Sequence, residues 1–415
     1  MREVVNKLIK EFENLYGSKP DVIVSVPGRI DFLNTHQDYK GLPVVSIGVN
    51  LRTYVAANKR DDRVGYAISL NIGVKDKDVI YLDNPSLVNK KWWGNYLRAC
   101  IISLRQNMYE IGGFNALIYS DVPIGAGMAS SAALETSFIG SMNELYGLGL
   151  ERKDIAEIAY HAEHDIMNIP CGRLDQYGCT FGGILLINTK PPYNVERLPK
   201  INGVFVVIDS GIRHSTADIH PRRQAEINSG LKQLLSMNMP KRLREKLGQY
   251  YWEPKWSEIT LSEIMPYLEK IPEIPRNRIL FTLKMNESTN IALDILRGKK
   301  IGEDRLKEII ETIASFYKKP RFETKEELIG AIMTYQHYLL SKLYDVSLPF
   351  LDKIVEVSIE NGALGAKLSG AGLGGAVIAL TKDHDTAKRV LDECIKIGAS
   401  RGWIVDIDIG LTRHM

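Results

Sequence analysis

Glycine and hydroxyl side chains are combined in residues 123–133 in a way that suits the binding of an anion. The segment reads Pro123-Ile-Gly125-Ala-Gly127-Met-Ala-Ser130-Ser131-Ala-Ala133. Its glycines let the backbone approach a ligand closely, and its serines stand at an expected helix start, where backbone N–H groups are unpaired. Phosphate is the natural ligand for such a loop. Taken alone, the segment also fits a tight turn capped by Ser130.

Two further glycine-rich segments lie far from this loop in the sequence. They are Pro27-Gly28-Arg29 and residues 365–375. The central loop has no lysine after its glycines, as a Walker A loop would, and it lacks the third glycine of a dinucleotide fingerprint. Three glycine-rich loops favour a site assembled from distant segments, although the last one could instead be a buried turn between packed backbones.

Hydrophobic periodicity predicts the elements that would hold the central loop. Residues 116–120 form a β-rich run before it, and the helix after it carries an apolar face made of Leu134, Phe138, Met142 and Leu145. A second helix is expected over 151–166, with strands near 22–26, 44–49, 204–208, 376–380 and 403–409. The N-terminal residues show helical spacing, and a charged, mostly helical stretch extends to about residue 345.

Composition narrows the class of protein. The 415 residues are 45% hydrophobic, and 53 basic and 50 acidic residues are interspersed to give a net charge of +3, so neither a nucleic acid nor a membrane is expected as a partner. The four cysteines form no zinc or disulfide pattern. No run approaches the ~18 apolar residues of a membrane span. We expect a cytoplasmic protein that acts on a small molecule.

Taken together, these motifs resemble the GHMP small-molecule kinase family, and within it most closely the galactokinases. The glycine-rich segments occur in the family's order. Between them lie His36-Gln-Asp38-Tyr39, Trp93-Gly-Asn95-Tyr96, Ala162-Glu-His-Asp165, Pro170-Cys-Gly172-Arg-Leu-Asp175-Gln176 and Asp209-Ser-Gly-Ile-Arg213-His214-Ser. The resemblance implies an α+β, two-domain GHMP kinase fold. Its N-terminal domain, 1–200, would be like ribosomal protein S5 domain 2, and its C-terminal domain, 201–415, would be ferredoxin-like with a helical insertion at about 220–345.

The resemblance further implies an ATP-dependent sugar 1-kinase that phosphorylates the anomeric hydroxyl of galactose or a related hexose. Asp175 would be the catalytic carboxylate with Arg29 as its partner, and Ser131 and Glu163 would bind Mg²⁺. ATP would contact Pro123, Gly125, Ala126, Gly127, Met128, Ala129, Ser130, Ser131, Ala132 and Trp93.

Each of these residues has an ordinary structural alternative. Glu163 could be a solvated helix carboxylate, Asp175 a helix cap and Arg29 half of a surface ion pair. Trp93 could belong to the core, and Arg213 and His214 are more typical of a domain junction than of reacting groups. Within the loop, the first of the family's three usual serines is Ala129.

The expected substrate contacts are Thr35, His36, Asp38, Gly172, Asp175, His220 and Gly370. Thr35 replaces the glutamate that galactokinases use to bind the C6 hydroxyl, whereas Asp38, expected near C3 and C4, is retained. His220 lies where a tyrosine is common. With a neutral Thr35, and with Arg222 and Arg223 nearby, a uronic acid 1-kinase of galacturonate-like substrates is an alternative.

Other functions remain open at this stage. A kinase for mevalonate or homoserine would share the fold, but the segments around Asp38 and Asp175 favour a sugar. A non-catalytic ATP- and sugar-binding regulator is possible on the same fold, although it would be expected to lose part of the catalytic set. The enzyme would be a monomer or a homodimer.

Overall fold

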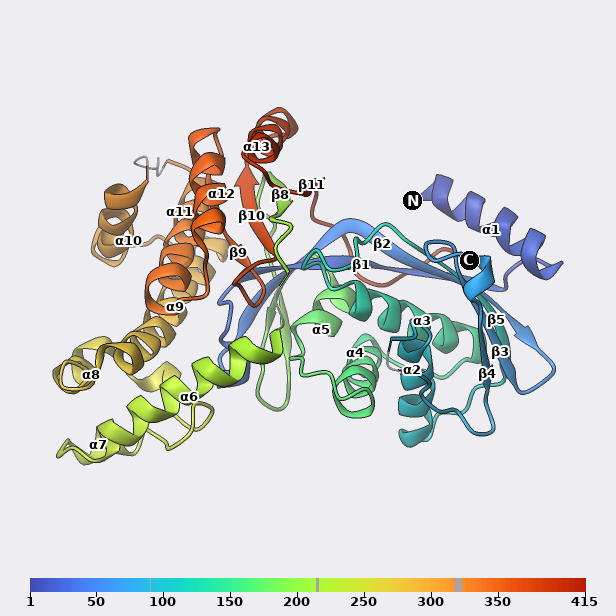
Figure 1. The fold of residues 1–415 in the computed structure, drawn as a ribbon, viewed down its shortest axis with the longest axis horizontal. Coiled ribbons are helices and arrows are strands. Elements are labelled where there is room, and N and C mark those ends of the chain that lie inside the picture. Colours follow the sequence, from blue (N-terminus) through green and yellow to red (C-terminus); the bar gives the residue numbers. More distant parts are fainter. Residues whose placement is uncertain (90, 214–215, 318–322) are drawn as a thin grey trace. The chain divides into compact units, whose positions relative to one another are not determined.

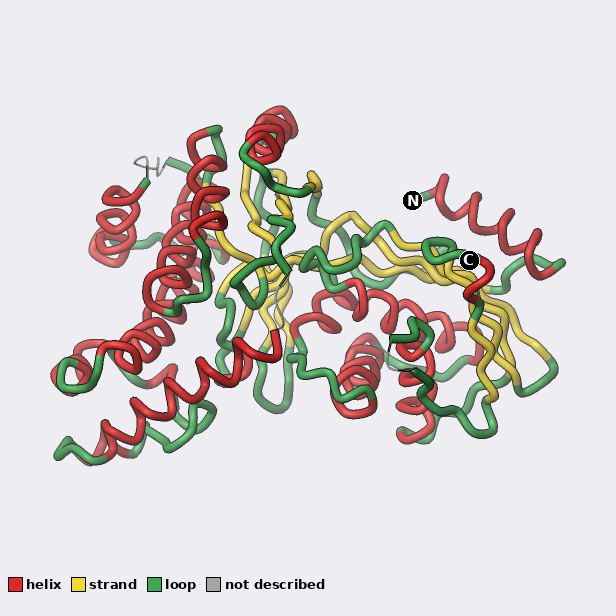
Figure 2. Tube along the Cα trace, viewed as in Figure 1, coloured by secondary structure: helices red, strands yellow, loops and turns green. Residues whose placement is uncertain are grey.

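The computed structural model describes residues 1–89, 91–213, 216–317 and 323–415. Two compact units are found: unit 1 comprises residues 1–30, 46–185 and 407–415, and unit 2 comprises residues 31–45 and 186–406. Both units contain helices and strands, as expected for an α+β chain (Figure 2).

The units are not contiguous in sequence, whereas the two expected domains are. The chain passes from one unit to the other within β1 (Val22–Leu33), β2 (Val44–Arg60) and β6 (Ile184–Ile187). The apolar runs that predicted β1 and β2 cover only the first part of each strand, so a single cut near residue 200 was the simplest expectation. The division at 200 stays a prediction.

Unit 1 is built on a sheet with helices on both faces. The strand order is β12-β1-β2-β5-β3-β4. The further strands are β3 (Val64–Ser69), β4 (Asp78–Tyr81), β5 (Gly113–Ser120) and β12 (Thr412–Arg413), and the helices are α1 (Arg2–Tyr16), α2 (Asn95–Gln106), α3 (Ser130–Tyr146), α4 (Arg152–His161), the π-helical turn η3 (Ala162–Ile166) and α5 (Leu174–Phe181). Helix α1 lies on the opposite side of this sheet from α2 to α5 (Figure 1).

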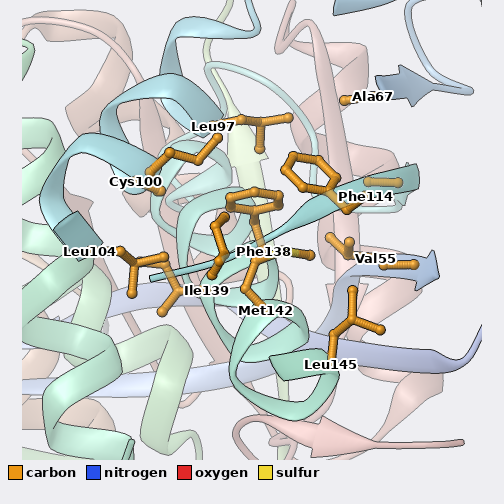
Figure 3. Close-up of a cluster of buried hydrophobic side chains, with 14 of the residues drawn as sticks. Val55, Ala67, Leu97, Cys100, Leu104, Phe114, Phe138, Ile139, Met142 and Leu145 are labelled. Atoms are coloured by element: carbon orange, nitrogen blue, oxygen red, sulfur yellow. The ribbon is translucent and has the colours of Figure 1, made fainter. Parts of the chain in front are cut away.

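Strand β2 explains how the sheet has two buried faces. Successive side chains of a strand point to opposite faces. Val55 and Ala57 pack with α2, α3 and α4, whereas Tyr54 and Ala56 pack with α1. On the first face, Phe138 of α3 meets Phe114 of β5 edge-on, with ring centroids 5.4 Å apart (Figure 3). This packing fixes the direction of α3 and therefore the place where it begins.

Unit 2 contains a four-stranded antiparallel sheet in the order β11-β8-β10-β9. In chain order this is fourth, first, third, second, which is the order of a ferredoxin-like sheet. The strands are β8 (Val204–Asp209), β9 (Gly365–Ser369), β10 (Ala376–Thr381) and β11 (Arg401–Val405), with β7 (Val195–Leu198) paired to β6. Helices α11, α12 and α13 contact this sheet.

The remaining part of unit 2 is helical, as expected for residues up to about 345. The helices of unit 2 are α6 (Thr216–Leu235), α7 (Lys241–Arg244), α8 (Leu261–Leu268), α9 (Glu273–Leu296), α10 (Glu303–Phe316), α11 (Lys325–Tyr338), the π-helical turn η5 (Leu339–Leu343), α12 (Pro349–Glu360) and α13 (His384–Lys396). Unit 2 also has the short 3-10 turns η1 (Asp38–Lys40) and η4 (Trp256–Glu258), whereas the 3-10 turn η2 (Val74–Asp76) lies in unit 1. No helix among the described residues is long and apolar enough to cross a membrane.

The helix expected over 151–166 is confirmed but is not uniform. Its α-helical part is α4, with Glu151 and Asp154 forming a capping box at its start. The last turn is the π-helical η3, where the amide of Met167 donates to the carbonyl of Ala162, five residues back. Such turns carry one extra residue and often occur at functional sites. Glu163 lies in this turn.

Gly28 in β1 must be a glycine for steric reasons. A Cβ built there would stand 2.9 Å from the Met128 carbonyl oxygen and 3.0 Å from Val122. We therefore expect Gly28→Ala to lower the free energy of unfolding by about 1–3 kcal/mol, measured by chemical denaturation. Gly302→Ser is the control, because a Cβ at Gly302 meets no atom within 4 Å. Equal stability of the Gly28 variant and wild type would contradict the close approach.

Candidate active site

The central loop connects β5 to α3 and has the backbone conformation of an anion cradle. Gly125, Gly127 and Ala129 have φ angles of 71°, 74° and 56°. Helix α3 begins at Ser130, and Ala129 is the residue that precedes it, with no side-chain hydrogen bond to the helix end. Ser130 therefore does not cap the helix, and the amides of the first turn face the loop without a side-chain cap. This arrangement suits phosphate.

Arg29 joins the loop to Asp175 at the start of α5. Its Nε and Nη2 donate to Oδ1 of Asp175 at 2.9 and 2.6 Å, and its Nη1 donates to the carbonyl of Gly127 at 2.6 Å. The arginine is 7% exposed. Charge-assisted hydrogen bonds of this kind are short and strong. Arg29 therefore binds both the Asp175 carboxylate and the backbone of the central loop. Because the arginine is buried, its pair with Asp175 is not a surface ion pair.

Glu163 of the π-helical turn is buried beside the same pair. Its Oε2 accepts a hydrogen bond from Nε2 of Gln176 at 2.7 Å. Burial raises the pKa of Glu163 to about 7, and the charge of Asp175 adds to this shift. Hydrogen bonds from Ser131 and Gln176 and the charge of Arg29 oppose it. Glu163 is therefore no solvated helix carboxylate, and unit 1 brings it together with Ser131, Asp175 and Arg29.

Glu135 and Gln176 also belong to this cluster, although they were not predicted as site residues. Both are fully buried. Burial raises the pKa of Glu135 well above its ordinary value, and the charge of Glu163 raises it further. The available signal was a single acid in the apolar first half of α3.

Two other predicted residues of unit 1 have less specific surroundings. The indole nitrogen of Trp93 donates to the Asp76 carbonyl at 2.9 Å, and its ring packs against the main hydrophobic cluster of the unit, beside Trp92. The half-buried ring thus supports the expectation of a core residue in part. Gly172 lies in the loop that leads into α5.

His36, one of the predicted sugar-contact residues of unit 2, belongs to a chain of hydrogen bonds. Nε2 of His36 lies 2.9 Å from the Ala371 carbonyl, so it must carry the proton. Nδ1 then accepts from the hydroxyl of Tyr39 at 3.1 Å, and that hydroxyl lies 2.5 Å from the hydroxyl of Tyr344. Burial lowers the pKa of His36 well below its usual value, which keeps the ring neutral. Gly370, with φ 85°, precedes Ala371.

The rings of two residues from other parts of unit 2 lie next to this segment. His220 of α6 lies 5.2 Å from both His36 and Tyr39, and Tyr251 lies 5.7 Å from Tyr39. Asp38 is the first residue of η1. Burial raises the pKa of Tyr251, and the charge of Asp38 raises it further, so the two side chains are neighbours. The structure therefore brings His36, Asp38 and His220 together. It adds Tyr251, whose loop is far away in sequence and gave no signal.

Two buried lysines lie next to the same residues. Lys367 donates to the Thr35 hydroxyl at 2.7 Å and to the Asp31 carbonyl at 3.2 Å, and burial lowers its pKa to about 8. Lys40 donates to the Thr282 hydroxyl and lies 4.7 and 4.6 Å from the ring centroids of Phe281 and Tyr344. The hydroxyl of Thr35 therefore meets a cation.

The arginines expected near Thr35 are engaged elsewhere. Arg223 pairs with Glu226 at 3.0 Å and with Asp345 at 2.8 Å, and Arg222 pairs with Glu226 at 3.2 Å. Arg213 binds both carboxylate oxygens of Asp209 within unit 2. His214 lies outside the described residues.

Three family models match parts of this chain. Residues 95–183 match the family model "GHMP kinases N terminal domain", residues 306–399 match "GHMP kinases C terminal", and residues 10–59 match the "Galactokinase galactose-binding signature". The chain is 29% identical over 379 residues to the galactokinase of Pyrococcus furiosus, covering 90% of this chain and 93% of that one. It is 29% identical over 402 residues to the galactokinase of a Roseiflexus species, covering 93% and 92%.

Solved structures give the same picture of the fold. The Lactococcus lactis galactokinase complexed with galactose has a TM-score of 0.78 at 22% identity and covers 99% of each chain. The Methanococcus jannaschii mevalonate kinase has a TM-score of 0.60 at 20% identity and covers 93% of this chain and 98% of that one. The expected two-domain fold is confirmed.

If Glu163 binds a metal ion, as the sequence predicts, this binding should depend on pH near neutrality, because a carboxyl must lose its proton before it binds a cation. With its pKa raised to about 7, Glu163 is neutral below that pH and anionic above it. We expect the Mn²⁺ affinity in the presence of ADP, measured by EPR, to increase as the pH rises through this value. Glu163→Gln should lack this dependence. A wild-type affinity that is constant from about pH 6 to 8 would contradict it.

Proposed function

Because the chain belongs to the GHMP kinases, we propose that it is an ATP-dependent sugar 1-kinase, which transfers the γ-phosphate of MgATP to the anomeric hydroxyl of galactose or a related hexose. The observation that carries this proposal is the contact of Arg29 with both Asp175 and the carbonyl of Gly127 in the loop. It links a carboxylate able to accept a proton to a cradle able to hold phosphate. The galactokinases among the relatives support the choice of sugar.

We assign the catalytic roles to Asp175 and Arg29. Both arginine bonds reach Oδ1 of Asp175, and we assign the other oxygen, Oδ2, to the anomeric hydroxyl, whose proton it accepts or orients. The guanidinium adds positive charge beside the loop, where the phosphoryl group would transfer.

ATP is assigned to the central loop and the first turn of α3. Ser131 and Glu163 would hold Mg²⁺, since hydroxyl and carboxylate oxygens suit this cation and it commonly takes only one or two carboxylates together with phosphate oxygens. The metal would offset the negative charge of the phosphates. The assignment of Trp93 to adenine remains a proposal from the family resemblance alone.

In unit 2 we assign the sugar to the segment that contains Thr35, His36 and Asp38, together with His220 and Gly370. The neutral His36 is oriented by its two hydrogen bonds and can present a fixed face to the sugar. Tyr251 joins this set, because its ring stands beside Tyr39 and Asp38. The proximity of these side chains supports one subsite within the unit.

A uronic acid 1-kinase is the second candidate, and the contact of Lys367 with Thr35 favours it. A C6 carboxylate near Thr35 would find the buried ammonium 2.7 Å from that hydroxyl. The arginines invoked from the sequence do not support it, because Glu226 and Asp345 already pair with them.

Location and assembly are further proposals. We assign the enzyme to the cytoplasm, which its four free thiols support. A monomer or a homodimer remains the expectation for its assembly.

Replacing Asp175 tests the catalytic assignment. Asp175→Asn keeps an oxygen for Arg29 but loses the basic carboxylate, so kcat for galactose should fall by about 10²–10⁴-fold with little change in the KM for ATP. ADP release would be measured. The control is Asp165→Asn, an exposed residue of the same unit that pairs with His161 and His164. Equal losses in both variants would contradict the assignment.

A substrate panel separates the candidate functions. We expect ADP release with galactose, and the panel would also contain glucose, galacturonate and glucuronate. If galacturonate is preferred, Lys367→Met should lower kcat/KM for the uronate by at least about tenfold more than for galactose, because one charged contact is lost. Turnover of galactose with none of galacturonate discards the uronate candidate. Measurable ATP binding without any sugar product would favour a regulator.

A further inference from the structure

Helix α11 carries three buried polar side chains that the proposed roles do not use. Thr334, Gln336 and His337 are each at most 2% exposed. The helix packs against β9, the last strand in the order of the unit 2 sheet (Figure 1). Burying a polar side chain is unfavourable unless it has a hydrogen-bond partner. The partners of these three side chains therefore indicate what they do.

Two of the three side chains accept hydrogen bonds from the backbone of β9. In an edge strand, the N–H groups of alternate residues point away from the sheet and need another partner. The amide of Ala366 donates to the Thr334 hydroxyl, and the amide of Leu368 donates to Nδ1 of His337, both at 3.3 Å. Helix α11 therefore covers this edge of the sheet and satisfies its amides.

The backbones of the helix and the strand also touch directly. A Cβ built at Gly365, the first residue of β9, would overlap the carbonyl of Gly330 in α11. No side chain separates the two elements at this point. The position of α11 therefore determines the position of β9.

A second hydrogen bond fixes the ring of His337. Because the Leu368 amide donates to Nδ1, that nitrogen carries no proton, and the ring proton is on Nε2. Nε2 donates to Oδ1 of Asp352 at 3.0 Å. The hydroxyls of Ser341 and Ser347 donate to the same carboxylate at 3.0 and 2.6 Å. The acceptor that His337 offers to β9 thus has a fixed direction.

Strand β9 and the loop after it contact the predicted sugar segment. Lys367 stands between the two anchored amides and donates to the Thr35 hydroxyl at 2.7 Å. The carbonyl of Ala371, two residues beyond the strand, accepts from Nε2 of His36 at 2.9 Å. Both bonds depend on where β9 lies, so a shift of the strand would move Thr35 and His36 or break their contacts.

The third polar side chain, Gln336, reaches the same segment without the strand. Its Oε1 accepts from the amide of Asn34 at 3.2 Å, and its Nε2 donates to the hydroxyls of Ser288 and Thr289 at 3.1 and 2.9 Å. Asn34 has a φ of 67°, a conformation that few residues other than glycine adopt. One helix therefore holds both the sugar segment and the strand that contacts it.

We propose that His337, supported by Thr334, is a positioning residue of the sugar subsite, which acts through the amides of β9 on Thr35 and His36. The inference rests on the proposed function for the identity of the sugar, whereas the contacts that carry it all lie within unit 2. A merely structural role would lower stability whichever hydrogen bond of His337 was lost. A positioning role requires the bond to Leu368.

Two conservative replacements separate the hydrogen bonds of His337. In His337→Asn the side-chain oxygen can take the place of Nδ1 and accept from the Leu368 amide, but the side chain is too short to reach Asp352. In His337→Gln the amide can reach Asp352, but no acceptor takes the place of Nδ1. His337→Leu retains neither bond.

Sugar affinity is the first measurement. We expect His337→Leu and His337→Gln to raise the KM for galactose by about tenfold or more, and His337→Asn to stay within about threefold of wild type, because small displacements of binding groups have large effects. The KM for ATP should be the same in all four proteins. Both constants come from ADP release.

Hydrogen exchange measures the same coupling without turnover. In His337→Leu the amides of residues 31–37 and 365–371 should exchange at least about tenfold faster than in wild type, because both segments lose an anchor. In His337→Asn they should exchange at the wild-type rate. Strand β5 of unit 1 should be unchanged in every variant.

Controls separate positioning from folding. Ser358→Ala removes a buried hydroxyl of α12 that donates to the Ile354 carbonyl of its own helix, and it should leave both measurements unchanged. If His337→Leu does not fold, Thr334→Val and Thr334→Ser repeat the comparison at Ala366. Serine keeps the acceptor and valine does not, so only the valine variant should show the two effects.

Two results would overturn the inference. One is a wild-type KM for galactose, or wild-type exchange of residues 31–37, in folded His337→Leu. The other is a loss in His337→Asn that equals or exceeds the loss in His337→Gln. If the wild-type protein releases no ADP with galactose, the proposed function fails instead, and hydrogen exchange still decides whether His337 holds the segment.

Discussion

The candidate site of unit 1 depends on the hydrogen bonds of the Arg29 guanidinium. This group connects strand β1, the loop before α3 and the first turn of α5 through three hydrogen bonds. Removing Asp175 would leave the charge of Arg29, which is buried, without compensation, and this is unfavourable. Gly28 makes the contact possible, since the neighbouring backbone of Met128 approaches within the space that a side chain would fill. Chemistry and packing are therefore linked at adjacent residues of one strand.

Unit 2 contains two buried lysines, whose positive charges must be stabilised. Lys40 and Lys367 are fully buried, and each donates to neutral oxygens, while two aromatic faces stabilise Lys40. Their charges help to keep His36 neutral. The hydrogen bonds of His36 thus give this ring a fixed tautomer and a fixed orientation before any ligand binds.

Residues close in sequence to a motif could be predicted, and residues that meet it only through the fold could not. The loop, the helix after it and the strands before it follow from local patterns, and family resemblance singled out Arg29, Glu163 and Asp175. Glu135 and Tyr251 escaped because their significance lies in neighbours from other elements. The suggestion that Arg222 and Arg223 act near Thr35 failed for the same reason, because the acids that pair with them lie in other parts of the chain or one turn away. Trp93 was singled out for adenine, and its packing fits a core residue equally well.

The π-helical turn that carries Glu163 has a consequence for how this site tolerates change in chain length. An α-helix advances by about 100° per residue, and the turn Ala162–Ile166 accommodates one residue more than a regular helix would. The direction of Glu163 is thus encoded by a count of residues as much as by their types. A deletion in α4 could be absorbed by converting this turn into regular helix, which would preserve the fold of unit 1 and swing the carboxylate away from Ser131. A comparison of residue types alone would not reveal such a deletion, whereas a comparison of the length of this helix would.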